Sequence, residues 1–230
     1  MPDRDAALDP VANWRAVRAA VERVVRAAGR DPGAVELLAV GKGHGAEAMR
    51  ALLEAGHRAF GENRVQEAEA KWPALRRDFP DLRLHLIGHL QTNKARDAVA
   101  LFDAIETVDS ERLAAALARE MARAGKRPDC FVEVNIGAEP QKGGVPPEAA
   151  DAFVETCRGR LGLPIVGLMC IPPAGADPMP HFLALGGIAA RHGLKRLSMG
   201  MTADYEAAVA AGSTEVRVGT AIFGERRPAQ

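Results

Sequence analysis

The sequence is poor in aromatic residues and carries no net charge. Aromatic side chains make up 4% of the 230 residues, and 30 Lys and Arg balance 30 Asp and Glu. Proteins that bind nucleic acid or anionic membranes usually present an excess of positive charge, and single-stranded nucleic acid also needs aromatic stacking surfaces. The composition therefore argues against both classes of partner.

Cysteines and long apolar runs are also few. Cys130, Cys157 and Cys170 are odd in number and widely spaced, which argues against a disulfide framework and a zinc site. No segment is apolar for long enough to span a bilayer, and residues 1–5 are partly acidic with no apolar stretch behind them, unlike a secretory signal. We therefore expect a cytoplasmic protein with reduced thiols, no metal and no membrane partner.

Two common phosphate-binding motifs are missing as well. The segment Gly41-Lys42-Gly43 lacks the Ser or Thr after lysine and the glycine spacing of a P-loop. No Gly-x-Gly-x-x-Gly pattern follows a strand candidate, so a dinucleotide-binding fold is not supported.

The chain instead alternates short apolar runs with longer amphipathic stretches. A helical pattern over residues 10–29 comes first, and eight strand candidates, each followed by a helix candidate, fill residues 36–224. This order predicts an α/β fold, a single (β/α)8 TIM barrel with an extra N-terminal helix, as one domain over residues 1–230. A doubly wound open sheet is the competing arrangement, but a count of eight strands favours closure. The predicted strands are residues 37–40, 58–60, 84–87, 104–107, 130–135, 165–168, 196–197 and 216–218, and the predicted helices are residues 46–55, 64–77, 94–101, 110–124, 147–158, 180–191 and 204–210, with a short turn after 221.

Lys42 is the most informative single residue. The apolar run before it ends at Gly41, and Gly43 and Gly45 follow, which predicts a buried strand that delivers a lysine to a loop. Desolvation lowers the pKa of a lysine, and a neutral amine can attack an aldehyde to form a Schiff base. The plainer alternative, which this segment alone favours, is a lysine that extends to solvent or binds a phosphate as a point charge.

Polar residues and glycines recur where the other predicted strands end. In a closed barrel these ends meet on one face, which is where barrels carry their sites. Ser198-Met199-Gly200 and Gly219-Thr220 follow the last two strands, where barrels commonly bind phosphate, although ordinary turn glycines are the alternative. Further polar strand ends are Glu62, Asn63, His89, Gln91, Asn135 and Cys170.

A ligand with an aldehyde near one end and a phosphate near the other would bridge Lys42 and the phosphate loops, because the first and last strands of a barrel are neighbours. Pyridoxal 5'-phosphate (PLP) fits this description. Arg217, inside the eighth predicted strand, could face the pyridine nitrogen and keep it unprotonated, since arginine does not give up its own proton. The alternative is a structural arginine paired with Glu215 or Asp204.

These segments together resemble the pyridoxal phosphate homeostasis proteins, the YggS/PROSC-like group, whose barrel is similar to the N-terminal barrel of bacterial alanine racemase. The resemblance runs over about residues 37–224. Its most specific part is the closing stretch, residues 210–224, which reads AAGSTEVRVGTAIFG. The other segments that carry it are residues 38–42, 60–63, 65–67, 85–94, 134–136, 167–169 and 197–201, with Asp204.

The resemblance implies a roughly monomeric barrel that holds PLP as a Schiff base on Lys42, with Arg217 near the ring nitrogen and the last two loops on the phosphate. It also implies a role in intracellular PLP and vitamin B6 homeostasis, with no established catalytic reaction and with apo PLP-dependent enzymes as candidate partners. The residues that it implies for cofactor binding are Lys42, Asn63, Ser198, Met199, Gly200, Arg217, Gly219 and Thr220.

The chain departs from the family pattern at several positions. The family usually has Ser before the lysine and Thr after it, where this chain has Gly41 and Gly43. A Lys-Ser-Gly element reads Lys142-Gly143-Gly144, and a Gly-Met-Ser element ends in Thr202. The glycines at positions 41, 43 and 143 lack hydroxyls that could order the loop. Their presence affects the expected affinity for the cofactor rather than the identity of the lysine.

A racemase also needs a second acid–base group opposite its lysine. In racemases of this kind that group is a tyrosine from a second domain of a partner subunit, whereas Tyr205 is the single tyrosine here and is expected to pack or cap a helix. His85 and His89 could act as acid or base, but are as often structural. We expect a binding protein rather than an enzyme. The alternatives are a PLP-dependent racemase-like enzyme of low activity, and an aldolase or phosphosugar isomerase without PLP.

Overall fold

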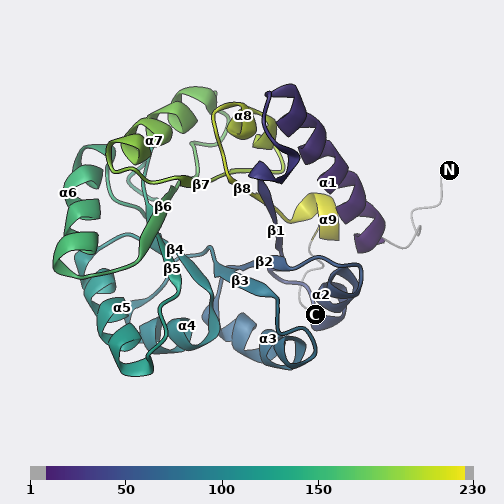
Figure 1. Ribbon diagram of the computed structural model, residues 1–230, viewed down its shortest axis with the longest axis horizontal. Coiled ribbons are helices and arrows are strands. Elements are labelled where there is room, and N and C mark those ends of the chain that lie inside the picture. Colours follow the sequence, from purple (N-terminus) through teal and green to yellow (C-terminus); the bar gives the residue numbers. More distant parts are fainter. Residues whose placement is uncertain (1–8, 226–230) are drawn as a thin grey trace.

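The computed structural model describes residues 9–225, which form a closed barrel of eight parallel strands with helices around it (Figure 1). Strand order around the barrel follows the sequence from β1 to β8, and β8 pairs with β1. The predicted TIM barrel is confirmed. The single-domain prediction and the observation on the N-terminal segment also involve residues 1–8 and 226–230, which lie outside the described part of the chain.

Each strand is short, and each is followed by a helical segment on the outside of the barrel. The strands are β1 (Glu36–Val40), β2 (Ala59–Glu62), β3 (Arg83–Leu86), β4 (Ala104–Val108), β5 (Asp129–Glu133), β6 (Ile165–Met169), β7 (Arg196–Met201) and β8 (Glu215–Val218). The helices are α1 (Pro10–Ala27), α2 (Ala46–Glu54), α3 (Val65–Asp78), α4 (Ala95–Leu101), α5 (Glu111–Ala124), α6 (Ala150–Glu155), α7 (Met179–Arg191), α8 (Tyr205–Ala210) and α9 (Thr220–Phe223).

Several boundaries differ from the sequence prediction, among them those of β7, β5 and the helical segment before β6. Strand β7 extends through Ser198-Met199-Gly200, because this segment pairs with both β6 and β8. Strand β5 ends at Glu133, and Asn135 lies in a loop where its side chain exchanges hydrogen bonds with the backbone of Glu139 (2.8 and 3.1 Å). The predicted helix over residues 147–158 is divided into a 3-10 turn, α6 and a π-helical turn at Thr156–Arg160.

Helix α1 packs on the outside of the barrel, where it contacts α2, α8 and α9. Asp9 caps its first turn by accepting hydrogen bonds from Val11 and Ala12, and Trp14 is buried against His57. The side-chain amide of Asn13 donates to the carbonyl of Ile222 in α9 (3.1 Å). The first and last helices therefore lie side by side, as Figure 1 also shows.

The barrel has an apolar outside and a partly polar inside. A large cluster of buried apolar residues joins strands and helices, while Ala104, Phe131 and Met169 form a separate small cluster on three neighbouring strands. Since side chains alternate between the two faces of a strand, this small cluster marks the inner face of β4, β5 and β6. Within residues 9–225, no helix has both the length and the apolar character that a membrane crossing requires.

Candidate functional site

Lys42 lies in a tight turn directly after β1, at the carboxyl end of the barrel. The amide of Gly41 donates to Gly61 on β2 (3.0 Å), the amide of His44 donates back to Gly41 (3.1 Å), and Gly43 has a φ of 75°. The Lys42 side chain is half-buried, and within residues 9–225 it has neither an ion-pair partner nor a hydrogen-bond partner. The turn thus presents an amine that no carboxylate of the described chain neutralises.

A buried ion pair supports this turn from the side of α3. Lys71 donates to the carbonyl of Gly41 (2.9 Å) and to Glu62 Oε1 (2.6 Å), and Trp72 Nε1 donates to the same carboxylate oxygen (3.0 Å). Burial raises the pKa of Glu62 even though Lys71 and Trp72 act against it. Glu62 is recognisable in the sequence as a polar strand end, whereas Lys71 is not, because its helical segment carries other charges that face solvent.

The segment after β8 lies beside the Lys42 turn, as the sequence predicted. Ala39 of β1 pairs with Val218 of β8, and a Cβ placed on Gly219 would stand 3.3 Å from the carbonyl oxygen of Val40. The ring of His44 lies 5.1 Å from that of Phe223 in α9. Thr220 is exposed at the start of α9, where the first amides have no partner within the helix. The amine and the candidate phosphate loop are therefore adjacent.

The end of β7 forms a second turn at the same face. Gly200 has a φ of 96°, and a Cβ on it would lie 2.5 Å from Ala208 Cβ, so only glycine fits this position. Asp204 then accepts a hydrogen bond from the amide of Met201 (2.6 Å). Thr202 is exposed within this turn. Met199 is fully buried, which leaves its side chain without access to solvent.

Arg217 points inward from β8 and contacts the two preceding strands. Its Nη1 donates to Ser198 Oγ (2.5 Å), and its Nη2 donates to the carbonyl of Cys170 (2.9 Å). The alternative pairing with Glu215 or Asp204 is not what the structure has. Glu215 is instead bound by Arg196 on β7 (2.7 and 2.8 Å).

The hydroxyl of Ser198 therefore does not face the phosphate loop. It is fully buried, accepts from Arg217 and donates to Glu106 Oε2 (2.5 Å). Its single proton is used inside the barrel, so we correct the assignment of this hydroxyl to a phosphate. Thr202, which the sequence analysis noted only as a departure from the family, is the hydroxyl that the turn after β7 exposes.

Glu106 and His85 complete the buried polar contacts beneath Arg217. His85 Nδ1 lies 2.6 Å from Glu106 Oε1 and 3.5 Å from Glu215 Oε2. Burial alone would lower the pKa of His85 and raise that of Glu106, but their mutual hydrogen bond and charge reverse both directions. Glu106 was not among the residues predicted from the sequence, although a charged residue within the apolar run of residues 104–108 is as unusual as Arg217 in its own strand.

Two further groups sit at the mouth of the barrel. Asn63 follows β2 and is half-buried, and its backbone packs so closely on Gly88 that a Cβ there would lie 2.3 Å from the Asn63 carbonyl oxygen. Glu133 ends β5, and burial, reinforced by Asp109, raises its pKa to about 7. Strand β5 is four strands from β1 in either direction, so Glu133 and Lys42 come from opposite sides of the barrel.

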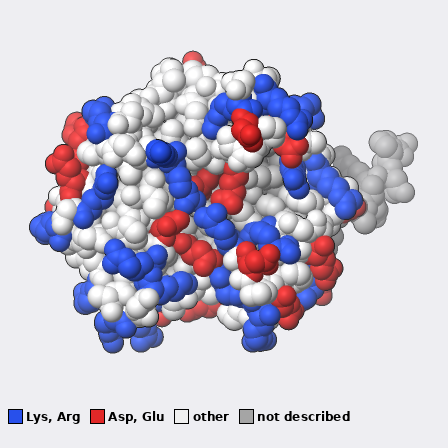
Figure 2. All heavy atoms as spheres, in the orientation of Figure 1, with Lys and Arg blue, Asp and Glu red and all other residues white. Residues whose placement is uncertain are grey.

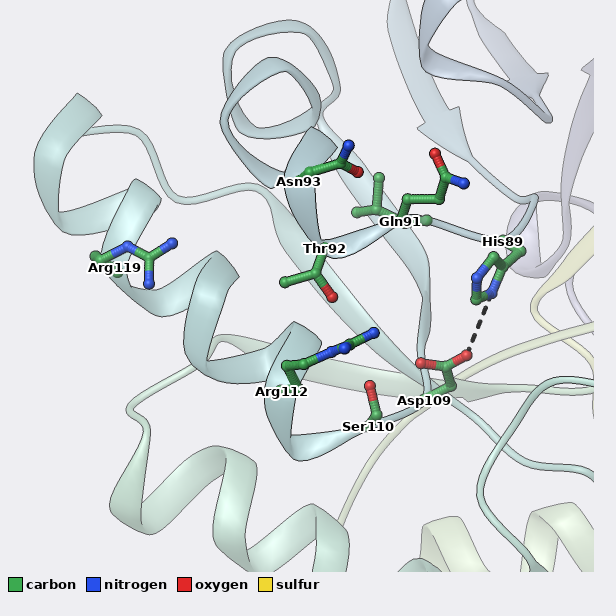
Figure 3. Close-up of a pocket in the computed structure, with 9 residues that line it drawn as sticks. His89, Gln91, Thr92, Asn93, Asp109, Ser110, Arg112 and Arg119 are labelled. Carbon is green, nitrogen blue, oxygen red and sulfur yellow. Dashed lines mark ion pairs between the residues drawn. The ribbon is translucent and has the colours of Figure 1, made fainter.

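A cavity of about 640 Å³ opens beside this mouth, between the loops after β3 and β4 (Figure 3). His89 lies at its inner end, 3.4 Å from Asp109, while Arg112 and Arg119 reach it from α5. His89 is mostly exposed and is not part of the buried contacts around Arg217. The cavity is lined by His89, Leu90, Gln91, Thr92, Asn93, Asp109, Ser110, Arg112 and Arg119.

One group of acidic residues and a histidine lies close enough together to be considered as a metal site. Glu36, His85 and Glu215 place possible metal-ligand atoms within 4.8 Å of one another, but Arg83 binds Glu36 (3.3 Å) and Arg196 binds Glu215. We interpret this group as an ion-pair network. On the face shown in Figure 2, positive and negative side chains are interspersed.

The residues present fit PLP. Three features meet at one end of the barrel: an amine with no partner among residues 9–225, a close-packed glycine loop that opens a helix, and a guanidinium with further donors. Tyr205 packs against the outer apolar cluster at the start of α8. Its place there agrees with the packing role expected from the sequence.

Comparison with known proteins points to the same ligand class. Residues 12–227 match the family described as alanine racemase, N-terminal domain. A pyridoxal phosphate homeostasis protein of Pseudomonas aeruginosa is 40% identical over 220 residues, covering 93% of this chain and 94% of the relative. One of Corynebacterium glutamicum is 36% identical over 222 residues, covering 91% of this chain and 99% of the relative.

Solved structures agree with the fold. PipY of Synechococcus elongatus without PLP superposes with a TM-score of 0.79 at 41% identity, over 89% of this chain and 99% of PipY, and PipY with PLP bound gives 0.77 at 39%. Alanine racemase of Clostridium difficile gives a TM-score of 0.67 at 16% identity, over 93% of this chain but 57% of the racemase, and so supports the fold alone. The chain thus belongs to the family of pyridoxal phosphate homeostasis proteins, built on the alanine racemase N-terminal domain.

Proposed function

We propose that this protein binds PLP at the carboxyl end of the barrel and serves intracellular PLP homeostasis. The observation that carries the proposal is the amine of Lys42, which lacks a partner within residues 9–225 and lies beside the loop that joins β8 to α9. The printed names of the curated relatives and the PLP-bound structure of PipY support it.

Each part of the cofactor has a matching group in the site. Lys42 would supply the amine for the aldehyde, and Arg217 would use its remaining N–H groups toward the pyridine nitrogen. The backbone of Met199-Gly200 would hold the phosphate together with Gly219 and Thr220 at the start of α9. Thr202 would add a hydroxyl, and Asn63 would lie near the ring. When bound, PLP would supply an electrophilic aldehyde and an electron-accepting ring, made weaker as an acceptor by an arginine partner.

The role is binding and delivery rather than catalysis. The relatives are named as homeostasis proteins, and the single tyrosine of the chain packs on the outside of the barrel. The protein acts as a cytoplasmic monomer that passes PLP to apo PLP-dependent enzymes.

One observation favours a second candidate function, a racemase-like activity at a low rate. Glu133 ends the strand opposite β1, and burial raises its pKa to about 7, which suits an acid–base group. Turnover of an amino acid that disappears in both Lys42→Ala and Glu133→Gln would establish this activity and replace the carrier role.

The test is the absorbance of the purified protein with and without PLP. We expect a yellow protein whose colour is lost in Lys42→Ala and kept in Lys195→Ala, which removes an exposed lysine before β7. Borohydride reduction followed by peptide mass analysis should place the adduct on Lys42. Delivery of PLP to an apo-enzyme without amino-acid turnover supports the carrier role, and a colourless protein that takes up no PLP contradicts it.

A further inference from the structure

The guanidinium of Arg217 lies at one end of a hydrogen-bonded chain that crosses the inside of the barrel. Arg217 donates to Ser198 Oγ (2.5 Å), Ser198 donates to Glu106 Oε2 (2.5 Å), and Glu106 Oε1 lies 2.6 Å from His85 Nδ1. We call these four residues, from β8, β7, β4 and β3, the inner chain. None of them is more than 4% exposed. Within the inner chain, the contact between Ser198 and Glu106 connects β7 to β4, which are not neighbours in the barrel.

The charges at each position fix the direction of these hydrogen bonds. A guanidinium only donates, and an ionised carboxylate only accepts. Burial alone would raise the pKa of Glu106, but His85, Arg217 and Ser198 together hold it below its usual range, so Glu106 is an acceptor. The one proton of Ser198 must therefore go to Glu106, and its lone pairs remain for Arg217.

This direction determines how Arg217 is held. Its Nη1 is bound to Ser198 on β7 and its Nη2 to the carbonyl of Cys170, the residue directly after β6. A planar guanidinium with two anchored donors has a defined plane, and its other N–H groups point in a defined direction. If the Ser198 hydroxyl turned its proton toward Arg217, two donors would face each other. The hydrogen bond between Arg217 Nη1 and Ser198 Oγ would then be lost.

We propose that Glu106 is a positioning residue for PLP, which acts through Ser198 to hold the Arg217 guanidinium in the orientation that meets the pyridine nitrogen. The hydrogen bonds of Glu106 all lie within the barrel, below the mouth. The part of the inference that concerns PLP rests on the proposed function, whereas the part that concerns Arg217 applies to the protein without ligand.

The negative charge of Glu106 is needed because the groups that face it from other strands are mostly cations and donors. His85 and Arg217 contribute positive charge, Ser198 contributes a proton, and Glu215 lies behind His85 with Arg196 on its other oxygen. Replacing Glu106 by glutamine keeps its shape but removes the charge and adds a donor. Ser198 can then turn its proton toward Arg217 and lose the contact.

The experiment compares Glu106→Gln, Ser198→Ala and the double variant, with Glu120→Gln as control. Glu120 is a buried carboxylate paired with arginines of α5, outside the barrel. We expect each single change to weaken PLP binding about tenfold, the effect of losing one charge-assisted hydrogen bond, and to shift the pH profile of the absorbance of bound PLP. The double variant should bind no more weakly than Ser198→Ala, and the control should bind as the wild type does.

A second readout needs no ligand. In a crystal structure of Glu106→Gln without PLP, we expect the Arg217 guanidinium to have left Ser198. A guanidinium that keeps both contacts there overturns the positioning role, as does a double variant in which the two losses add. If the wild type takes up no PLP, the proposed function fails, and the ligand-free structures still decide the positioning role. If Glu106→Gln does not fold, Ser198→Ala decides, and wild-type PLP affinity in that variant overturns the inference.

Discussion

Lys71 in α3 donates a hydrogen bond to the backbone carbonyl of Gly41, the residue immediately before Lys42, at 2.9 Å. The same ammonium is bound to Glu62, which is fully buried at the end of β2. Lys71 is thus neutralised by Glu62 and holds the turn. Lys42, which directly follows Gly41, has no partner within residues 9–225. The contrast identifies which amine is structural and which is available.

Replacing Lys71 by methionine should destabilise the protein strongly. The change leaves the Glu62 carboxylate buried without its cation and the Gly41 carbonyl without its donor, a loss we expect to be about 3 to 5 kcal/mol in the free energy of unfolding measured by urea denaturation. Lys94→Met is the matched control, because Lys94 is partly exposed and pairs with Asp97. It should cost less than about 1 kcal/mol.

A second variant separates the ion pair from simple packing. In Lys71→Met combined with Glu62→Gln, the buried charge is gone, so much of the lost stability should return. Equal instability of the single and the double variant would show that packing around α3, rather than the pair, supports the turn.

Gly41 is required by its surroundings. A Cβ at this position would stand 2.7 Å from Met49 Sδ and 2.9 Å from Glu62 Oε1. We expect Gly41→Ala to cost about 1 to 3 kcal/mol in thermal or urea unfolding, because the Glu62 carboxylate is held by Lys71 and cannot yield. In a Met49→Ala background the cost of Gly41→Ala should be smaller, whereas an unchanged cost would place the strain elsewhere.

Stability should also depend on pH through Glu133. Its pKa in the folded protein is raised to about 7 from an ordinary value of 4.5, so the folded state holds the proton more tightly than the unfolded state. The stabilising contribution is complete below pH 4.5 and is lost as the pH rises through 7. Glu133→Gln should therefore be more stable than the wild type by about 1 to 3 kcal/mol at pH 8 and similar at pH 4. Glu148→Gln, at an exposed position, should show no such pH dependence.

The turn after β7 requires glycine at position 200, whereas Gly187 in α7 has room for a larger residue. Gly200→Ala places a methyl 2.5 Å from Ala208 Cβ at a φ of 96°, and should both destabilise the protein by about 1 to 3 kcal/mol and weaken PLP binding. Gly187 lies in α7 with nothing within 4 Å of an added Cβ. Gly187→Ala should stabilise the protein by about 0.5 to 1 kcal/mol without changing PLP binding. If Gly200→Ala and Gly187→Ala changed PLP binding equally, this would contradict phosphate binding at the turn after β7.

The strands could be predicted because their burial leaves apolar runs in the sequence, and eight such runs separated by amphipathic helices left few alternatives to a barrel. The end of β7 could not, because Ser198 and Gly200 have turn-like propensities that pairing with β6 and β8 overrides. The same error led to the assignment of the Ser198 hydroxyl to a phosphate, since a residue read as loop was expected to face solvent.

Glu106 illustrates the other limit of prediction from sequence. Arg217 stood out within its strand and was assigned a role, but its true partners are far away in the sequence and come together only when the barrel closes. A lone buried charge in one strand predicts that a partner exists. It does not say which strand supplies it.

The closeness of Val40 and Gly219 has a consequence for how the protein matures on the ribosome. Lys42 is synthesised early and the β8–α9 segment late, so the two sides of the proposed site are brought together only near the end of translation. A ligand that needs both parts recognises only chains whose last strand has joined the first, and its binding favours that joined state by mass action. A bound ligand would therefore act as a clasp between the first strand and the last.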